Sequence, residues 1–494
     1  MTVAAFPDPL NDERIPQDCT APALDLLLIN PPWIRRQGNI WAEVGSCSPP
    51  LGLAYLAAYI MHHGHTCAIL DMEAERLLPE RLPERLRDVP RPRAVGISVT
   101  TSTFYAARDI VTRLREIEPA ALYIAGGVHP TVRPEESLDG LGVDVVVRGE
   151  GEKPLLALLR GEPAATVPGT GSRLDGVLRM PPPGPFFPNL DEVPPPAYEL
   201  LPMHAYHPAL GSYRRLPAAS MVVSRGCPGR CTFCFGGLLG QRWRFFSATR
   251  ILADIQRLVT DYGIKEISFY DDTFTANPGI REVCEGIIRN DLDVSWVCFA
   301  RVDTIDLELL RLMKKAGCHQ IMFGLESADR AILRAIRKRF DPEMVVQAVK
   351  LSKQAGLDVR LAIMFGNPGE TTATIERTIA FVKRLNPDIL IANITTPYPG
   401  TEMFNWAKEH GCLRTENWDE YTLSQCVMEL PTIASSDVEA AYAGVYRRFY
   451  LRPSYLLRRL ARLRSPAAVQ LHYQSLKAVL AMRSARPPAA SPLK

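Results

Sequence analysis

Short apolar runs recur along residues 24–160, and stretches with helical spacing separate them. Each run has four to six residues, is rich in Leu or β-branched residues, and lacks polar alternation, as strands buried on both faces do. The expected strands are Leu26–Asn30, Cys67–Asp71, Ala94–Val99, Leu122–Ala125 and Val143–Val147. Helical spacing at 51–63 and 104–117 supplies connections between them. This alternation predicts an α/β fold that begins with a doubly wound, Rossmann-like parallel sheet over 24–160.

A second alternation of strands and helices runs through residues 216–420. Its expected strands are Ser220–Ser224, Glu266–Tyr270, Ser295–Ala300, Gln320–Gly324, Val359–Gly366 and Ile389–Asn393. Its expected helices are 248–262, 279–289, 306–316, 342–355 and 371–385. Six such units predict a partial (β/α)6 barrel of the TIM type, shorter than the eight-fold barrel.

Three segments fall outside these two domains. Residues 1–23 are polar and contain proline, so we interpret them as a leader arm. Eight of the sixteen residues 181–196 are proline, which excludes a helix or a central strand and indicates a linker over 161–215. Residues 421–494 are predicted to form a basic helical C-terminal region.

Composition and charge narrow the class of protein. With 494 residues, 47% hydrophobic and 22% charged, the chain has ordinary globular values, which exclude a mainly disordered or fibrous protein. No uncharged apolar run approaches the length of a transmembrane helix, and no signal peptide is recognisable, so we expect a cytoplasmic protein. After Glu439 there are eleven Lys and Arg and no acid, so with a net charge of +3 the preceding residues carry −8.

Three of the 11 cysteines stand in one short loop, in the spacing CxxxCxxC. They are Cys227, Cys231 and Cys234, and they directly follow the first expected strand of the second domain. Thiolates are the soft ligands that iron–sulfur clusters select, and three thiolates leave one iron of a four-iron cluster open. A structural zinc ion would need a fourth ligand, and no Cys or His lies nearby in a zinc-finger spacing. Three unrelated buried cysteines are the remaining alternative.

This loop, with Phe233 just before its last cysteine, resembles the radical S-adenosylmethionine (SAM) superfamily. The resemblance implies that Cys227, Cys231 and Cys234 hold a 4Fe–4S cluster whose open iron binds SAM. It also implies a contact between Phe233 and SAM. One electron then cleaves SAM into methionine and a 5′-deoxyadenosyl radical, which abstracts hydrogen from the substrate. In this chemistry the protein orients the cofactors and excludes water.

Later strand ends carry further elements that are similar to those of the superfamily. Asp271 and Asp272 stand where the family binds the SAM amino group, and Arg301 offers a cation for the SAM carboxylate. The remaining contacts implied by the resemblance are Glu326 in Gly-Leu-Glu-Ser, and Gly366 and Glu370 in a Gly-Asn-Pro-Gly-Glu turn near the adenine. The alternatives are a solvated strand end for the aspartates and a favourable first-turn carboxylate for Glu370.

The strand ends of the first domain are rich in small residues and hydroxyls, which let a large planar ligand approach the backbone. Preceding a radical SAM core, they resemble the cobalamin-binding radical SAM class. The contacts that this resemblance implies are Pro50, Leu51, Gly52, Ser98, Thr100, Thr101, Gly126, Gly127, Gly149 and Glu150.

One departure from other cobalamin domains concerns histidine. Many mutases supply an axial ligand from an Asp-x-His-x-x-Gly motif, and none of the nine histidines here has Asp two residues before it. His129 lies in a strand-end loop but receives no ligand role. A rival class, the methylthiotransferases, holds a second cluster in the first domain; Cys19, Cys47 and Cys67 are the candidates by count.

Residues 446–464 contain seven arginines and no acid, and leucines recur at helical spacing from Ser454 onward. A helix packed on the core, contact with a membrane surface and nucleic-acid binding are the alternatives, and sparse aromatic interleaving disfavours nucleic acid.

Taken together, the sequence predicts a cobalamin-dependent radical SAM enzyme that acts on a small molecule, with an electron donor such as flavodoxin or ferredoxin. Methyl transfer to an unactivated carbon or phosphinate phosphorus is the leading reaction. An oxidative cyclase of the anaerobic magnesium-protoporphyrin monomethyl ester type, a methylthiotransferase and a non-catalytic cobalamin-binding module are the alternatives. No residue is singled out for proton transfer in catalysis.

Overall fold

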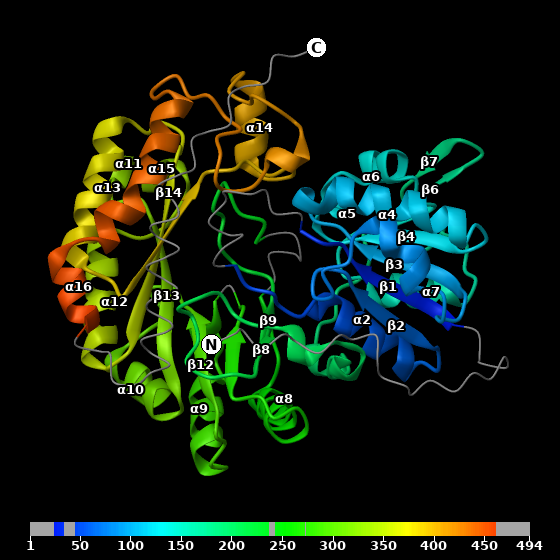
Figure 1. Cartoon of the computed structure of the whole chain (residues 1–494), viewed down its shortest axis with the longest axis horizontal. Helices are drawn as coiled ribbons and strands as arrows, with labels where there is room; N and C mark the ends of the chain where they lie inside the picture. Colours follow the sequence, from blue (N-terminus) through cyan, green and yellow to red (C-terminus); the bar gives the residue numbers. More distant parts are fainter. Residues whose placement is uncertain (1–23, 34–44, 237–242, 272, 461–494) are drawn as a thin grey trace, which may run out of the picture.

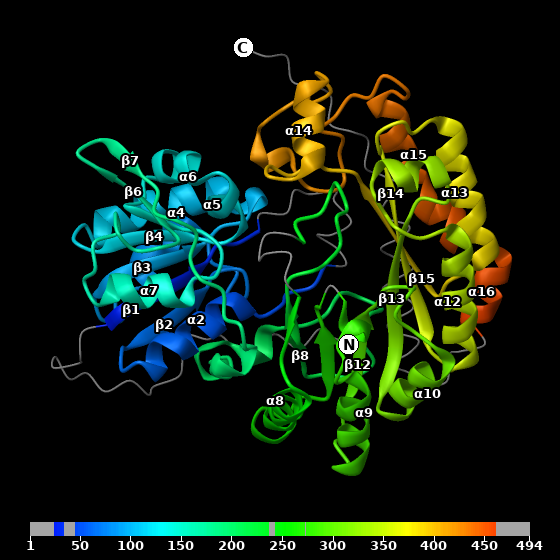
Figure 2. The ribbon, with the colours of Figure 1, turned by 180° about the vertical axis from the view of Figure 1, so that it is seen from behind.

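The chain forms two α/β lobes that lie side by side (Figures 1 and 2). This computed structural model describes residues 24–33, 45–236, 243–271 and 273–460. The first lobe is a seven-stranded sheet in the order β2-β1-β3-β4-β5-β6-β7, of which β1 to β5 are parallel. Its strands are β1 Leu24–Asn30, β2 Cys67–Asp71, β3 Pro92–Ser98, β4 Leu122–Gly126, β5 Val145–Val147, β6 Thr170–Leu174 and β7 Val177–Arg179. The predicted doubly wound sheet is therefore confirmed.

Helices cover both faces of this sheet. They are α2 Leu51–His62, α3 Leu82–Arg85, α4 Phe104–Ile117, α5 Val128–Val132, α6 Pro134–Leu141 and α7 Glu152–Leu159. Alternate strand residues pack on opposite sides: Leu26 and Leu28 contact the core that includes α2 and α7, whereas Leu27 and Ile29 contact the core that includes α4 and α6. Burial on both faces explains the unbroken apolar runs.

The sheet extends further along the chain than the sequence predicted. Residues 161–215 were assigned to a linker, but β6 and β7 form an antiparallel hairpin on the edge of β5. Asp175 and Gly176, both with positive φ, make the turn. An Asp-Gly pair is a strong signal for such a hairpin, and the short flanking strands hid it.

The proline-rich segment after the hairpin is a packed connection between the lobes. Phe187, Leu190 and Val193 are almost fully buried and share one core with α2 of the first lobe and with the helices of the second. The rings of Tyr55 and Phe246 stack across the boundary with their centroids 6.0 Å apart. The two lobes therefore share a continuous apolar core.

The second lobe is the predicted partial barrel. Its sheet has the order β15-β14-β13-β12-β11-β8, and all neighbouring strands are parallel. The strands are β8 Ala218–Met221, β11 Glu266–Phe269, β12 Ser295–Phe299, β13 Cys318–Glu326, β14 Asp358–Phe365 and β15 Ile389–Ile394. The helices are α8 Ala248–Asp261, α9 Ile280–Arg289, α10 Leu307–Lys315, α11 Arg330–Ala335, α12 Pro342–Gln354, α13 Thr372–Leu385 and α14 Glu402–Glu409.

Tyrosine hydroxyls cover the open edge of the barrel at β15. The Tyr446 hydroxyl accepts from the Ala392 N–H and donates to the Ala392 carbonyl, both at 3.0 Å. Tyr450 does the same for Leu390, at 2.9 and 3.0 Å. Both tyrosines lie on α15 (Ser435–Tyr450), four residues apart and so on one helix face. They satisfy an edge strand that would otherwise expose unpaired backbone groups.

The described part of the basic tail packs on the barrel. Helix α16 (Pro453–Leu460) places Tyr455 and Arg459 against the Asp388 carbonyl, and Arg458 donates to the carbonyls of Asn386 and Pro387. The rest of the predicted amphipathic helix lies outside the described residues, as does the leader arm. Among the helices that the structure describes, none is long and apolar enough to cross a membrane.

Candidate cofactor site

The cysteine loop is carried by a two-stranded hairpin at the carboxyl end of β8. Strand β9 (Ser224–Arg225) pairs antiparallel with β10 (Arg244–Phe245), and all three cysteines lie between these strands. Asp271 holds the base of the loop, because its carboxylate accepts from the Val223 N–H at 2.7 Å and from the Ser224 hydroxyl at 2.6 Å.

Two glycines leave open space beside the sulfur atoms. A Cβ on Gly229 would lie 3.3 Å from Cys227 Sγ and 4.0 Å from Cys231 Sγ. A Cβ on Gly236 would lie 3.7 Å from Cys227 Sγ and 3.9 Å from Cys234 Sγ. The sulfur atom of Cys227 therefore lies near the same glycines as those of Cys231 and Cys234, a grouping that fits a cluster with three protein ligands.

The spacing of these cysteines argues against a single zinc ion. Within the described ranges, no three His, Cys, Asp or Glu side chains come close enough together to hold one metal ion. A structural zinc site needs four ligands at about 2.0–2.3 Å from one centre. A multi-iron cluster accepts the wider arrangement, because each thiolate binds a different iron.

Two cations lie beside the cysteine loop. The hydrogen bond from Arg301 to Asp303, and in lesser part the thiolates of Cys227 and Cys231, raise the pKa of Arg301. Burial lowers the pKa of Lys338, but Glu326 and the thiolates of Cys231 and Cys234 outweigh it and raise the pKa overall. An ammonium and a guanidinium beside the loop stabilise the charge that ligating cysteines carry.

The other residues assigned to SAM lie around the same strand ends, and several already have protein partners. Arg301 pairs with Asp303 through two nitrogens, at 2.9 and 2.7 Å. Glu326, with φ of +63°, accepts from Lys338 at 2.8 Å, and Phe233 lies with its ring centroid 5.8 Å from the Lys338 ammonium. Asp272 lies outside the described residues. These SAM contacts stay predictions.

Glu370 is fully buried and bonds to its own turn. One carboxylate oxygen accepts from the N–H groups of Gly366 and Asn367 at 2.6 and 3.0 Å, and the other has no hydrogen-bond partner. Burial raises the pKa of this carboxyl to about 7, against the lowering effect of the two N–H donors. Because Thr371, not Glu370, caps helix α13, the first-turn alternative does not describe its position.

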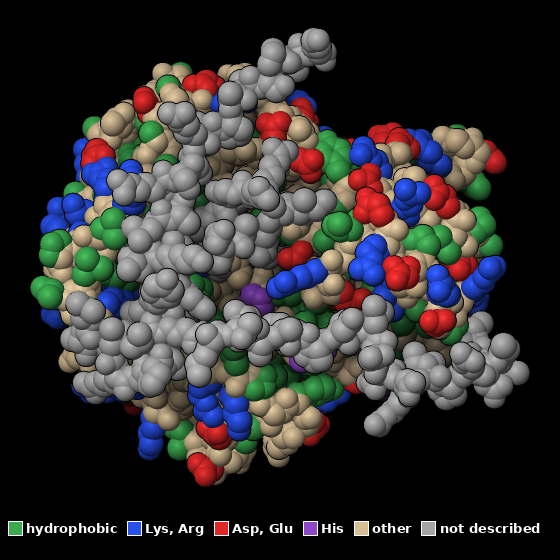
Figure 3. Space-filling view, viewed as in Figure 1, with side chains coloured by type: hydrophobic (Ala, Val, Ile, Leu, Met, Phe, Trp, Pro, Cys, Tyr) green, Lys and Arg blue, Asp and Glu red, His purple; other side chains and the backbone are tan. Residues whose placement is uncertain are grey.

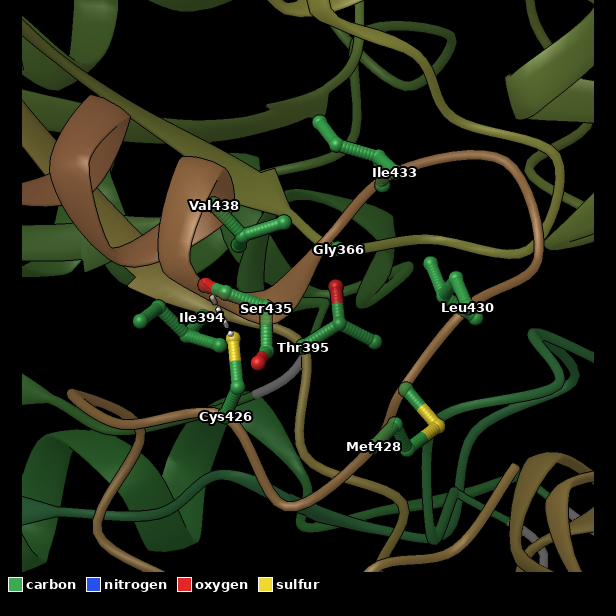
Figure 4. Close-up of a pocket in the computed structure, with 9 residues that line it drawn as sticks. All are labelled: Gly366, Ile394, Thr395, Cys426, Met428, Leu430, Ile433, Ser435 and Val438. Carbon is green, nitrogen blue, oxygen red and sulfur yellow. Dashed lines mark hydrogen bonds between the residues drawn. The ribbon is translucent and has the colours of Figure 1, made fainter. Parts of the chain in front are cut away.

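The space beside Gly366 is nearly closed. Residues 426–438 pass over the carboxyl ends of β14 and β15 and leave a cavity of about 10 Å³ (Figure 4). Cys426 Sγ donates to the Ser435 carbonyl there, as the dashed line shows. This volume suits a single water. The contact between Gly366 and adenine stays a prediction.

The residues assigned to cobalamin form an open rim at the carboxyl ends of β3, β4 and β5. Gly127 lies in the loop after β4 with φ of +105°, and a Cβ there would lie 2.8 Å from the Val99 carbonyl oxygen. Thr100, Gly52 and Gly127 are exposed, and no atom comes within 4 Å of where a Gly52 Cβ would lie. The remaining members are Pro50, Leu51, Ser98, Thr101, Gly126 and Gly149. Small exposed residues of this kind let a planar ring approach the backbone, and the individual contacts stay predictions.

Among the residues predicted to contact cobalamin, Glu150 forms ion pairs within the protein. Its carboxylate lies 3.2 Å from Arg225 and 2.8 Å from Arg244, and it accepts the Phe187 N–H at 3.0 Å. Glu152 lies 2.7 Å from Arg225. We call these four charged residues, Glu150, Glu152, Arg225 and Arg244, the interlobe clamp; it joins the end of β5 to the cysteine hairpin. The clamp leaves Glu150 little capacity to bind a cofactor.

The carboxyl ends of the two sheets face each other. A Cβ on Gly400, at the end of β15, would lie 2.6 Å from the Val132 side chain of the first lobe and 2.9 Å from Phe235 of the cysteine loop. Trp418 donates to Glu136 of the first lobe at 2.6 Å. The cysteine loop and the small-residue rim therefore border one interface.

His129 belongs to the packing of this interface. It is fully buried, its Nδ1 lies 3.2 Å from the Thr101 hydroxyl, and its ring packs against Phe104 and Trp418. Burial, with a smaller effect of Arg133, lowers the pKa of His129 to about 4, so the ring is neutral at pH 7. Nearby, Trp33, Ser102, Tyr105 and Asp419 help line a hollow of about 340 Å³ between the first lobe and the segment before α15.

The candidates for a second cluster do not converge among the described residues. Cys67 lies on β2, where burial raises the pKa of its thiol to about 12, and Cys47 pairs through its backbone with His207. Cys19 lies outside the described residues.

Comparison with known proteins agrees with this geometry. Residues 221–382 match the family model of the radical SAM superfamily, and residues 39–159 match that of the B12 binding domain. The chain belongs to the cobalamin-binding radical SAM enzymes, whose cofactors are a 4Fe–4S cluster, SAM and cobalamin.

Individual relatives cover most of the chain. An uncharacterised methyltransferase of Pyrococcus horikoshii is 37% identical over 442 residues, 88% of this chain and 94% of that protein. The anaerobic magnesium-protoporphyrin IX monomethyl ester cyclase of Rubrivivax gelatinosus is 25% identical over 432 residues, 84% of this chain and 76% of that one. The radical SAM methyltransferase TsrM of Kitasatospora setae, solved with cobalamin and a 4Fe–4S cluster, shares the fold with a TM-score of 0.65. It is 20% identical, over 80% of this chain and 76% of TsrM.

Sequence reasoning missed the charged residues that surround the site. Lys338 follows α11 in an unremarkable basic stretch, and Arg225 and Arg244 flank the cysteine loop without any recognisable motif. Their partners are 12 to 94 residues away, so only the fold brings them together.

Proposed function

We propose that this chain transfers a methyl group to an unactivated carbon of a small molecule. The observation that carries the proposal is the shared interface, where the small-residue rim of the first lobe faces the cysteine loop of the second. When bound, the cluster and SAM supply a 5′-deoxyadenosyl radical and cobalamin supplies a carrier for the methyl group. The similarity to a methyltransferase over 88% of the chain supports this reaction.

The residues of the chain hold these groups in place. Cys227, Cys231 and Cys234 bind the cluster, and Arg301 and Lys338 offset the charge of the thiolates. The interlobe clamp fixes the hairpin that carries the loop against the end of β5. The apolar core shared by the lobes helps to keep water from the reactive radical.

The test is an anaerobic incubation of the reconstituted holoenzyme with SAM and dithionite. We expect 5′-deoxyadenosine from SAM cleavage and S-adenosylhomocysteine from methylation of the bound cobalamin. Cys231→Ala should lose iron and form no 5′-deoxyadenosine, whereas Cys47→Ala serves as the control and should keep both. A Cys231→Ala protein that still cleaves SAM would contradict the cluster assignment.

The same incubation separates methyl transfer from the second candidate, oxidative cyclisation, which the similarity to the cyclase favours. A cyclase needs SAM for the radical only, so it would release 5′-deoxyadenosine without S-adenosylhomocysteine. SAM with a deuterated methyl group would carry its label into the product of a methyltransferase and not into that of a cyclase.

A further inference from the structure

One row of residues crosses the inner face of the barrel sheet and keeps part of its surface exposed. Strand pairing aligns Phe299 with Met322 and Met322 with Arg360, and the Tyr270 ring stacks on Phe299 at 5.7 Å. All four of these residues are only half-buried. Their neighbours along the strands, such as Phe269, Ile321 and Val359, point the other way and are buried against the helices. Part of the inner face is therefore left uncovered by the described side chains.

Arg360 stands out in this row because no residue in the described part of the chain pairs with its guanidinium. Its Nε is buried without a hydrogen bond, and no described residue gives the side chain a hydrogen bond or an ion pair. The groups that act on its charge are the phenols of Tyr270, Tyr450 and Tyr446, none of them a carboxylate, and burial lowers the pKa of Arg360. By contrast, the buried Arg225, Arg244 and Arg250 each contact a carboxylate.

Such a cation is costly in a folded protein. Removing a guanidinium from water, even in part, raises its free energy unless hydrogen bonds and an opposite charge replace its hydration. Arginine, moreover, presents a planar fork of donors that matches carboxylate and phosphate oxygens. The missing partner is therefore an anion with at least two oxygens.

A second polar group points to the same face. Asn393 lies on β15, where Leu390, Ala392 and Ile394 pack against the helices and the alternate positions face inward. Its side-chain oxygen is buried and has no hydrogen-bond partner. Asn393 aligns with Met364, which lies four residues, or about 13 Å, along β14 from Arg360, so the two polar groups lie at two ends of one face of the sheet.

We propose that Arg360 binds an acidic group of the substrate, a carboxylate or a phosphate, inside the barrel. The Tyr270 and Phe299 rings then border the apolar part of the same molecule. Arg301 and the SAM motifs lie at the carboxyl ends of the strands, whereas Arg360 is the third residue of β14. This inference rests on the proposed function and adds the chemical class of the substrate to it.

The test uses the full holoenzyme and two probes, inorganic phosphate and acetate, each compared with chloride at equal ionic strength. We expect at least one probe to raise the melting temperature of the wild type. Arg360→Gln should abolish this shift, Arg360→Lys should keep part of it, and the exposed Arg289→Gln is the matched control that should keep all of it.

The ligand-free variants give a second readout. If Arg360 serves a ligand and not the fold, Arg360→Gln removes an unpaired charge and should melt no lower than Arg289→Gln. A lower melting temperature, a wild type that responds to neither anion, or an unchanged shift in Arg360→Gln would each overturn the proposal.

A competition experiment identifies the source of the anion. The wild-type affinity for SAM should be the same in the responding anion and in chloride, because the proposed group belongs to the substrate. Weaker SAM binding in that anion would assign Arg360 to the SAM carboxylate and overturn the inference. Formation of 5′-deoxyadenosine and S-adenosylhomocysteine tests the proposed function separately.

Discussion

Neutralising one carboxylate of the interlobe clamp is a direct test of how the lobes are held together. Glu150 has a side chain that is only 3% exposed and lies within 3.2 Å of both Arg225 and Arg244. Glu150→Gln keeps the shape and one acceptor oxygen but replaces the other oxygen by a donor that faces arginine. Arg225 then keeps Glu152 as a carboxylate partner, and Arg244 keeps its hydrogen bond to the Phe187 carbonyl.

The contacts of Glu150 determine how much stability Glu150→Gln should lose and how this loss should depend on pH. Removing one partner of a buried ion pair costs about 3–5 kcal/mol, and the retained acceptor places this change near the lower end, at about 3 kcal/mol. Burial raises the pKa of Glu150, but the hydrogen bond from Arg244 and the charge of Arg225 bring it below its ordinary value of 4.5. The stabilisation is therefore present above pH 4.5 and is lost as the pH falls through the lower folded pKa.

The assay is urea unfolding of the wild type and Glu150→Gln between pH 3 and 8, with hydrogen exchange at the backbone of β5 and β9 as a local probe. Glu162→Gln is the matched control, because Glu162 is exposed and has no ion pair. The difference between the wild type and Glu150→Gln should be about 3 kcal/mol at pH 7 and should shrink at acid pH. If Glu150→Gln stays within about 0.5 kcal/mol of the control at pH 7, as surface changes do, the clamp does not hold the lobes.

Two further predictions concern groups outside the clamp. Tyr446→Phe removes the hydroxyl that pairs with the Ala392 N–H and carbonyl on the barrel edge. This change should lower the free energy of unfolding by about 2–3 kcal/mol and speed hydrogen exchange at the Ala392 amide. Unchanged exchange would contradict this role of Tyr446. Because the pKa of Glu370 is raised to about 7, its carboxyl favours folding below pH 4.5 and loses this effect as the pH rises to 7. Glu370→Gln should therefore gain up to about 3 kcal/mol over the wild type at pH 8 and none at pH 4, measured by urea midpoints; an equal difference at both pH values would refute the titration.

The sequence predicted the strands well, because both sheets bury their strands and so leave apolar runs. The expected Leu122–Ala125 and Glu266–Tyr270 differ from β4 and β11 by one residue at one end. The sequence did not predict the strands at the sheet edge. The hairpin that turns at Asp175 and Gly176 lies in the stretch predicted to be a linker, because its strands are short. The tyrosine cover of β15 has no sequence signature, since it depends on which strand forms the edge of the sheet.

In the candidate site, too, features set by local sequence were predictable, and contacts between distant residues were not. The cysteine loop was predictable because its three cysteines lie within eight residues of each other, and local spacing alone brings them together. Glu326 was assigned to SAM, yet the structure pairs it with Lys338, a contact that exists only because β13 and the residues after α11 meet at the loop. Long-range ion pairs carry no periodicity, so the sequence could not separate cofactor contacts from the charges that support them.

The loop after β5 shows how one short segment can serve both lobes. Gly149, with φ of +80°, donates its N–H to Thr131 and stays with the rim of the first lobe, while Glu150 and Glu152 reach the cysteine hairpin. Arg225 is only two residues before Cys227, so a displacement of the β5 loop is passed to the first cysteine through two short ion pairs. The buried charges of the clamp, together with Phe187 of the proline-rich connection that bonds to them, therefore hold the rim beside the cysteine loop.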